Sequence, residues 1–194
     1  MSENELETSD KIIEAAVGLI EEKGLHSVRM KEIATAAGIS EMTVFRHFSS
    51  KVGLLETIVK KYSYVPALRE IFEKKLIWEL EADLLLISET YQKIMFKNKS
   101  LVLIILQERT LLPANIMEEA SPYYFKDFMR NYFKEMQTKG KLATQEIDAL
   151  VLAFMSMNFG YFLSKAVLSD KFINVSDETY IDICVQLFAK SLRP

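Results

Sequence analysis

Apolar residues recur at intervals of three and four positions along almost the whole of this 194-residue chain. Such spacing places them on one face of an α-helix, whereas a half-buried strand requires apolar and polar residues to alternate. Only four prolines and six glycines interrupt the pattern. We therefore predict an all-α fold.

The N-terminal part of the chain is divided into short helices by glycine and serine. Glycine tolerates the left-handed conformation in which many helices end, and a serine or threonine oxygen accepts the unpaired N–H groups at a helix start. The expected stops are Gly24 and Gly38, and the expected caps are Thr8 or Ser9, Ser40, and Ser49 or Ser50. These signals predict a first helix up to Gly24 and further helices at about 30–37, 41–47 and 51–62.

After Pro66 the predicted helices are longer. They are expected at about 67–77, 80–97, 101–111, 122–138, 144–168 and 177–192. Pro122 marks a start, because the fixed φ and missing N–H of proline suit the first helical position. The run from Leu101 to Leu106 would also suit a buried strand, but it has no partner strand. We expect a head at 1–62 and a larger helical body at 63–194.

Charge and cysteine content predict a cytoplasmic protein. The net charge is −3, so any affinity for nucleic acid must come from a local patch, such as the excess of basic residues between positions 29 and 61. On charge alone, a solvated face is the more common explanation of such an excess. The single Cys184 cannot form an intramolecular disulfide, and the opening MSENELETSD lacks a secretory pattern. The longest aliphatic run, Leu101 to Leu106, is far shorter than the roughly 20 residues of a membrane span, so no membrane partner is expected.

Nothing in the sequence indicates an enzyme. The two histidines, His26 and His47, have no evident catalytic partner, and neither has Cys184. No metal-ligand spacing or phosphate-binding loop is present, so no cofactor is expected.

The segment AGISEMTVFRHFSSK reads as two helices joined by a tight turn. Gly38 makes the turn, Ile39 can fill the core between the helices, and Ser40 starts the second helix. In a helix-turn-helix the second helix presents its N-terminal side chains to base edges in the major groove. Because Val44 and Phe48 point inward, the side chains between and before them are candidates to contact DNA.

This segment and its flanks resemble the head of the TetR family of bacterial transcription regulators. The matching elements are, in order, Gly24, Ile33-Ala34, Gly38-Ile39-Ser40, Thr43-Val44-Phe45, His47-Phe48, Ser50-Lys51 and Leu54-Leu55. Their order and spacing fit over about residues 9–62, whereas beyond Pro66 only length and helicity fit. The resemblance implies a homodimer that binds double-stranded operator DNA with its heads and a small effector with its body.

By this resemblance Thr43, Phe45 and Arg46 lie in or beside the major groove, and His47 and Lys51 contact phosphates. Arg46 is the best candidate for base readout, because a guanidinium can bond guanine O6 and N7 together. A solvent-exposed arginine without a partner is the alternative. The complete predicted DNA-binding set is Arg29, Ser40, Glu41, Met42, Thr43, Phe45, Arg46, His47 and Lys51.

Two positions depart from the family pattern. Phe45 stands where tyrosine is usual, so its contact would be apolar, for example with a thymine methyl group. Arg29 stands at the usual threonine cap and cannot accept an N–H bond, although it could pair with phosphate. Ser27 could cap that helix instead.

Small residues form a stripe on the helix predicted at 144–168. The stripe consists of Ala149, Ala153, Ser156, Gly160 and Ser164. Small side chains let another helix approach closely, and a mid-helix glycine costs ~1 kcal/mol relative to alanine, which a close partner would offset. The resemblance implies that the last two long helices form the dimer interface, with Cys184, Leu187 and Phe188 on the final one. Close packing within one subunit would explain the stripe equally well.

The opposite side of the same helix, together with the preceding helix, predicts an effector site. A buried amide needs hydrogen-bond partners, and a ligand could supply one to Asn158. Aromatic and methionine side chains suit an adaptable pocket, although such a stripe is more often simply core. The predicted effector-binding residues are Phe125, Phe128, Met129, Tyr132, Phe154, Asn158 and Phe162.

The sequence thus predicts a ligand-responsive transcription regulator. A repressor released from an inverted-repeat operator by an apolar or amphipathic effector is the favoured form. The alternative is a helical carrier or sensor of small molecules that no longer binds DNA, which the departures at Arg29 and Phe45 and the acidic Glu41 would suit. A purely structural helical adaptor would not explain the head motif.

Overall fold

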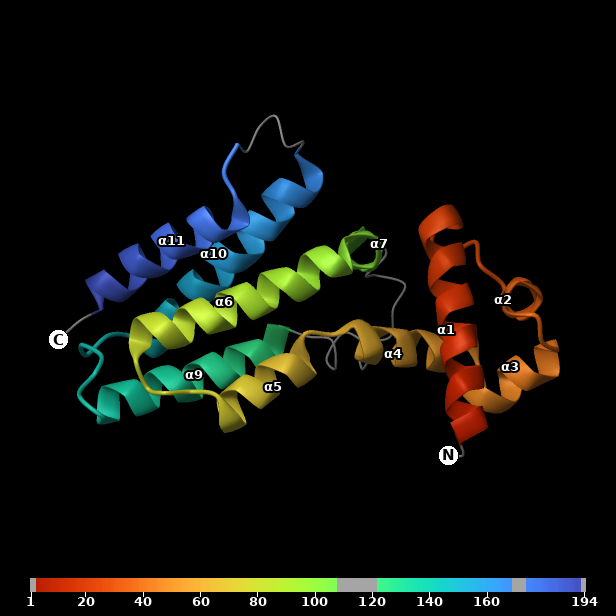
Figure 1. The fold of residues 1–194 in the computed structure, drawn as a ribbon, viewed down its shortest axis with the longest axis horizontal. Coiled ribbons are helices and arrows are strands. Elements are labelled where there is room, and N and C mark those ends of the chain that lie inside the picture. Colours follow the sequence, from red (N-terminus) through yellow and green to blue (C-terminus); the bar gives the residue numbers. More distant parts are fainter. Residues whose placement is uncertain (1–2, 108–121, 169–173, 193–194) are drawn as a thin grey trace. The chain divides into compact units, whose positions relative to one another are not determined.

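The computed structural model describes residues 3–107, 122–168 and 174–192. Throughout these ranges the regular secondary structure is α-helical, which confirms the predicted all-α fold (Figure 1). The helices are α1 Glu3–Lys23, α2 Met30–Ala37, α3 Glu41–Phe48, α4 Lys51–Tyr62, α5 Val65–Lys74, α6 Leu80–Lys97, α7 Lys99–Gln107, α9 Pro122–Thr138, α10 Ile147–Val167 and α11 Asp177–Ser191.

The chain divides into two compact units. The first contains α1 to α4 and also α7, and the second contains α5, α6, α9, α10 and α11. The sequence analysis assigned α7 to the C-terminal body, but Leu101 is buried in the core of the first unit, and Ile104 and Ile105 pack against that core. The apolar side of α7 therefore packs in the first unit, and this segment is a helix and not a strand. The end predicted for this helix, 108–111, lies outside the described residues.

The core of the first unit follows from the spacing of apolar residues. Ile12, Ala16 and Ile20 recur at four-residue intervals on α1 and are fully buried. Val44 of α3 and Leu54 of α4 join the same buried cluster. Because three short helices share one apolar cluster with α1, the orientation of α3 is fixed by packing as well as by its turn.

In the first unit, helix starts agree with the predicted caps at Ser40 and Ser50 and disagree at Thr8 or Ser9. The Oγ atoms of Ser40 and Ser50 accept the N–H groups of Thr43 and Gly53, both at 3.1 Å. The prediction of a cap at Thr8 or Ser9 is wrong, because α1 already begins at Glu3. Thr8 lies inside the helix and donates its hydroxyl to the Asn4 carbonyl at 2.8 Å.

The second unit is built around α9, α10 and α6. Within it α9 packs on α10 and α5, and α6 packs on α10 and α11. Two helix starts differ from the prediction: α5 begins at Val65, and α10 begins at Ile147, because the Glu146 carboxylate accepts the N–H groups of Asp148 and Ala149. Figure 1 shows α11 lying alongside α10 and α6.

Among the described residues, α10 is long and apolar enough to cross a membrane by length and composition. The sequence analysis missed this feature because it considered only uninterrupted aliphatic runs. The buried side of α10 carries Asn158, whose amide is hydrogen-bonded inside the protein. One such helix is weak evidence for a membrane span, because a helix of a soluble protein core passes the same test.

Candidate functional site

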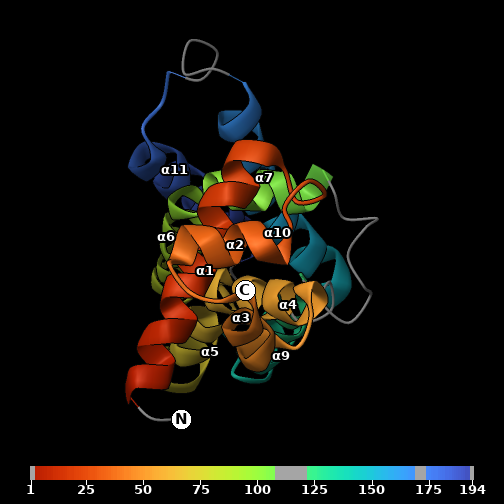
Figure 2. The same cartoon turned by 90° about the vertical axis from the view of Figure 1, so that its right-hand side faces the viewer.

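The turn between α2 and α3 is built by Gly38 and Ile39. Gly38 has a φ of 69°, the left-handed region that glycine enters without steric cost. The Ile39 N–H donates to the Ala34 carbonyl at 3.0 Å, and its side chain packs against the core of the first unit. This geometry is the helix-turn-helix that the sequence predicts. Figure 2 shows how α1, α2 and α3 are arranged.

The start of α2 is stabilised by a glutamate. Arg29 occupies the cap position, and its backbone N–H donates to the Glu32 carboxylate at 3.0 Å. That bond, together with the Lys23 ammonium at 3.2 Å, lowers the pKa of Glu32. Ser27 is therefore not the cap, and the exposed Arg29 side chain makes no capping hydrogen bond.

Helix α3 has one buried side and one exposed side, as its sequence predicts. Val44 and Phe48 are buried, whereas Met42 is 81% exposed and Phe45 is 42% exposed. Glu41 and Arg46 are also exposed. Burial of the exposed apolar side chains against a partner would be favourable, so this surface has the character of a contact surface.

Three further residues of the predicted DNA-binding set have defined partners or positions. Ser40 is exposed and its Oγ lies 2.8 Å from the Thr43 hydroxyl, so both groups take part in the cap. His47 is half-buried, with its ring centroid 6.1 Å from that of Phe48. The most exposed side chains of α3 are therefore those that take no part in the cap.

Lys51 has a structural contact that sequence reasoning did not foresee. Its Nζ donates to the backbone carbonyl of Leu25 at 2.7 Å and lies 3.4 Å from that of His26. Both carbonyls belong to the turn that follows α1, more than 20 residues earlier in the chain. Lys51 thus ties the first residue of α4 to that turn.

The predicted effector residues come together in the second unit, but most of them are packed core. Six are buried and Phe128 is half-buried: Phe125, Met129, Tyr132, Phe154, Asn158 and Phe162 form the buried group. The Asn158 Nδ2 donates to the Phe154 carbonyl at 3.0 Å, and Gln92 Nε2 lies 3.5 Å from Asn158 Oδ1 and donates to the Asn158 backbone carbonyl at 2.7 Å. The amide that the sequence singled out is therefore satisfied by protein groups.

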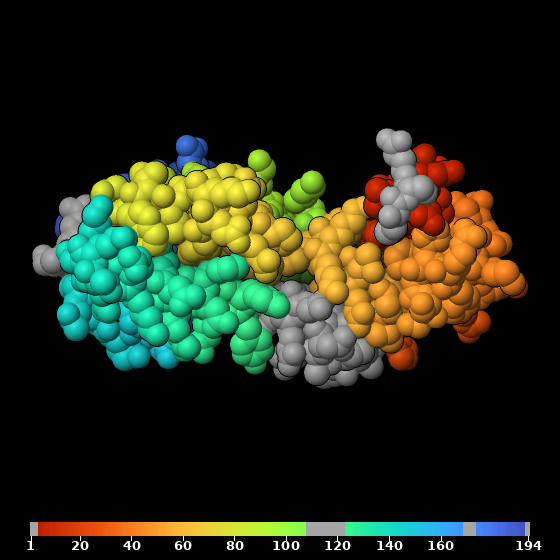
Figure 3. Space-filling view, turned by 90° about the horizontal axis from the view of Figure 1, so that it is seen from below, coloured from red at the N-terminus to blue at the C-terminus, as the bar shows by residue number. Residues whose placement is uncertain are grey.

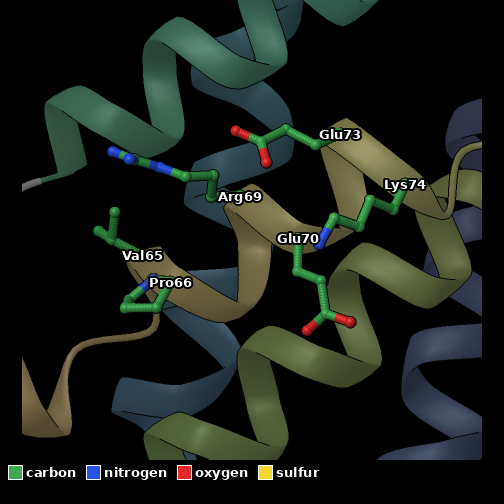
Figure 4. A pocket seen from close by; sticks show the side chains of 6 residues that line it. All are labelled: Val65, Pro66, Arg69, Glu70, Glu73 and Lys74. Carbon is green, nitrogen blue, oxygen red and sulfur yellow. The ribbon is translucent and has the colours of Figure 1, made fainter.

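Two hollows are found in the second unit. One, of about 330 Å³, lies between α5 and α9 and contains two of the predicted effector residues in its wall. It is lined by Phe72, Leu76, Trp78, Phe128, Asn131, Tyr132 and Glu135. The other, of about 320 Å³, is lined by six residues that all belong to α5, from Val65 to Lys74 (Figure 4). A single helix cannot enclose a ligand, so the first hollow is the better candidate.

The predicted dimer residues lie mainly on the outside of the subunit. Ala149, Ala153, Ser156 and Gly160 are exposed and Ser164 is half-buried. A Cβ added at Gly160 would meet no atom within 4 Å. Within the described residues, therefore, no helix of the same subunit packs closely on the stripe.

Exposed apolar side chains border the stripe. On α10 the period of 100° per residue places Leu152, Phe159, Leu163 and Val167 next to it, and all four are exposed. On α11 Leu187 is 66% exposed, while Cys184 and Phe188 are half-buried. The Phe188 ring packs inward on Phe154, with centroids 5.6 Å apart, so it belongs partly to the core.

Comparison with known proteins identifies the same N-terminal region. The family "Bacterial regulatory proteins, tetR family" matches residues 12–58. The uncharacterized HTH-type transcriptional regulator YvkB of Bacillus subtilis is 30% identical over 186 residues, which cover 95% of this chain and 97% of YvkB. That alignment includes the second unit as well as the helix-turn-helix.

Solved structures share the whole fold. GusR of Salmonella enterica has a TM-score of 0.75 at 23% identity, and the match covers 98% of each chain. AibR, in a complex with isovaleryl coenzyme A and operator DNA, has a TM-score of 0.67 at 19% identity over 93% of this chain and 97% of its own. The fold is therefore similar to that of these proteins in both units.

Proposed function

The chain belongs to the tetR family of bacterial regulatory proteins, and we propose that it is a ligand-responsive repressor that binds an inverted-repeat operator as a homodimer. The observation that carries the proposal is the outer side of α3. Met42, Phe45 and Arg46 are exposed on a short helix that Ser40 caps and Val44 anchors. Such a helix is held rigidly while its outer side chains stay available for the major groove.

The roles proposed for the head follow the chemistry of each side chain. Arg46 reads a guanine, Phe45 contacts a thymine methyl group, and Thr43 reaches a base edge beside them. Arg29 and His47 bond phosphates and fix the register of the head on the duplex. Glu41 and Met42 stand at the start of α3, where they face the same groove.

A mobility-shift assay with the DNA flanking the chain's own gene tests this function. We expect a complex on that DNA that persists in the presence of excess random DNA, and whose affinity falls steeply as salt rises. A head that no longer binds DNA would give no shift at any salt concentration. That outcome would favour a carrier or sensor of small molecules.

We further propose that α10 and α11 form the homodimer interface. The small-residue stripe of α10 and the exposed apolar residues that border it suit a second helix better than solvent. In a two-fold dimer the same surface is used by both subunits, so one stripe faces its copy. The two second units would then place two heads on one duplex.

The operator should therefore be an inverted repeat. Two α3 helices related by a two-fold axis enter successive major grooves when the half-site centres lie about 34–36 Å apart, or somewhat farther. DNase footprinting followed by substitution of each half-site measures this directly. A single asymmetric half-site that binds the protein with full affinity would contradict the proposed arrangement.

Lys51 is proposed to position the head as well as to contact phosphate. Replacing it with alanine removes a charged hydrogen bond to the Leu25 carbonyl, a contact worth about 1.5–3 kcal/mol when one partner is charged. We expect Lys51→Ala to melt at a lower temperature than the wild type and to bind all DNA sequences more weakly. Thermal unfolding and the salt dependence of binding are the measurements.

Melting temperature and salt dependence distinguish a phosphate contact of Lys51 from its structural role. A pure phosphate contact would lower the salt slope by about one and leave the melting temperature unchanged. Lys31, which is exposed on α2, provides the matched control, because Lys31→Ala removes the same charge from the same unit. If both variants melt alike, the bond to Leu25 does not stabilise the head.

The effector proposal concerns the second unit. A ligand can release DNA only if it binds the DNA-incompetent state more tightly than the competent one. Binding between α9 and α10 would require buried residues such as Phe154 to move apart. The hollow beside Phe128 and Tyr132 is already open and needs less rearrangement. Through the short link at Ser63, a shift of α5 could be passed to α4 and so to the head.

A further inference from the structure

The hollow between α5 and α9 is an aromatic cavity. Its wall contains four rings, and these are arranged in pairs: Phe72 stacks on Phe128 with centroids 5.0 Å apart, and Trp78 stacks on Tyr132 at 5.8 Å. The Phe72 ring also meets Tyr132 edge to face at 6.3 Å. Figure 3 shows the face on which α5, in yellow, and α9, in green to cyan, lie side by side.

The electrostatics of the aromatic cavity favour positive charge. The faces of aromatic rings are negative, and Glu135 is the charged residue in the lining. Behind the wall the Tyr132 hydroxyl donates to Asp83 at 3.1 Å, and that carboxylate is only 1% exposed. A phenol that donates to a carboxylate has a more electron-rich ring, which strengthens its attraction for a cation.

A cation of the chain already contacts two residues of the cavity wall. The Lys139 Nζ lies 4.8 Å from the centroid of the Trp78 ring and 2.9 Å from the Glu135 carboxylate. The Trp78 ring and the Glu135 carboxylate together therefore hold an ammonium group. The Lys139 ammonium thus lies where the charged part of a ligand would bind.

Trp78 is held in place from its backbone. Its φ is 62°, in the left-handed region that a bulky residue rarely adopts. Lys141 donates to the Trp78 carbonyl at 2.8 Å, and the preceding N–H, of Ile77, donates to Asp83 at 3.0 Å. These bonds fix the ring against Tyr132 before a ligand arrives, which lowers the entropic cost of binding.

We propose that the aromatic cavity binds a planar aromatic cation, with its rings against Phe72 and Trp78 and its positive charge beside Glu135 in place of the Lys139 ammonium. The inference rests on the proposed function for the role of this ligand as effector. Binding itself does not depend on that role. A neutral or anionic aromatic molecule of the same size would lack the attraction to Glu135 and would be repelled or held less tightly.

The chain has one tryptophan, Trp78, so its intrinsic fluorescence reports on this cavity alone. The probes are N-methylquinolinium, naphthalene and 2-naphthoate, which share a bicyclic ring and differ in charge, with N-acetyltryptophanamide as the control for collisional quenching. We expect saturable quenching by the cation, with an affinity roughly 2- to 30-fold above that of naphthalene, as cation–π attraction predicts. Calorimetric titration provides the second measurement. Equal affinities for the three probes would overturn the proposal.

Substitutions of Glu135 and Lys139 are expected to change the affinity for the cation in opposite directions. Glu135→Gln should weaken binding of N-methylquinolinium and leave naphthalene unchanged, because only the charge is removed. Lys139→Met should tighten binding of the cation, because it removes the resident competitor and frees the Glu135 carboxylate. Lys134→Met, at an exposed position on α9, is the matched control and should have no effect. Weaker binding to Lys139→Met would contradict the assigned charge.

Release of operator DNA is measured separately with the same probes. Quenching of Trp78 together with release supports both the cavity and its role as effector site. Quenching without release keeps the cavity as a ligand site and contradicts the effector role. Failure to bind operator in the first place contradicts the proposed function, while the fluorescence titration still tests the cavity.

Discussion

Replacing Gly160 with leucine is expected to produce a folded monomer whose affinity for the operator is lower by about 10²–10⁴-fold. Among the described residues, a Cβ added at this position has no neighbour within 4 Å, so the new side chain starts in open space. It would instead project from the small-residue stripe at its narrowest residue, where the two copies of α10 must approach most closely. Each head would then bind its half-site without the gain in effective concentration that a linked second head provides.

Analytical ultracentrifugation, a melting curve and an operator titration test this expectation together. Gly160→Ala is the first control: it keeps the stripe small and should leave the dimer intact, with about 1 kcal/mol gained in helix propensity. Lys134→Leu is the second, because it adds the same side chain to an exposed position on α9. A Gly160→Leu protein that stays dimeric at micromolar concentration would show that α10 is not the interface.

Local signals in the sequence predicted much of the fold. The bounds of α2, α4, α6 and α9 agree with the expected ranges. Three of these helices have a strong start or stop signal, namely Gly38 for α2, Ser50 for α4 and Pro122 for α9, whose effect depends only on adjacent backbone groups. The start of α1 was missed because Thr8 bonds backward to Asn4, so a residue type that commonly caps a helix lies within one.

Tertiary contacts account for what the sequence did not predict. The periodicity of α3 correctly separated buried Val44 from exposed Met42. It could not show that the Lys51 ammonium reaches the Leu25 carbonyl, since that contact joins residues far apart in the chain. Phe72 and Trp78 likewise gained their significance only when the fold placed them beside α9, whereas the sequence analysis considered the rings of α9 and α10 alone.

The small-residue stripe shows how structure removes an ambiguity of sequence. A run of small residues on one helix face fits a partner from the same subunit or from another. The exposure of Ala153 and Gly160 excludes a partner within the described part of the subunit. The apolar residues that flank the stripe are unfavourable in water, which supports the proposal that a second subunit covers it.

Arg46→Ala is expected to lower affinity for the operator by about 5- to 150-fold, which corresponds to the ~1–3 kcal/mol of a bidentate contact to guanine. Arg46 is exposed in the last turn of α3, so its loss should leave the fold of the head unchanged. Binding to random DNA should change far less, because a single charge contributes only a small part of the phosphate attraction. The substitution is therefore expected to reduce sequence recognition rather than general affinity for DNA.

Operators substituted at every base pair of one half-site show whether that assignment holds. The wild-type protein should discriminate at one guanine position that Arg46→Ala no longer distinguishes, while all other positions keep their ranking. Lys134→Ala removes a positive charge from the second unit and should leave every position unchanged. Arg46→Lys is the sharper comparison, because lysine keeps the charge but loses the planar pair of donors. If lysine restores both affinity and preference, Arg46 contacts a phosphate and the base is read by another side chain of α3.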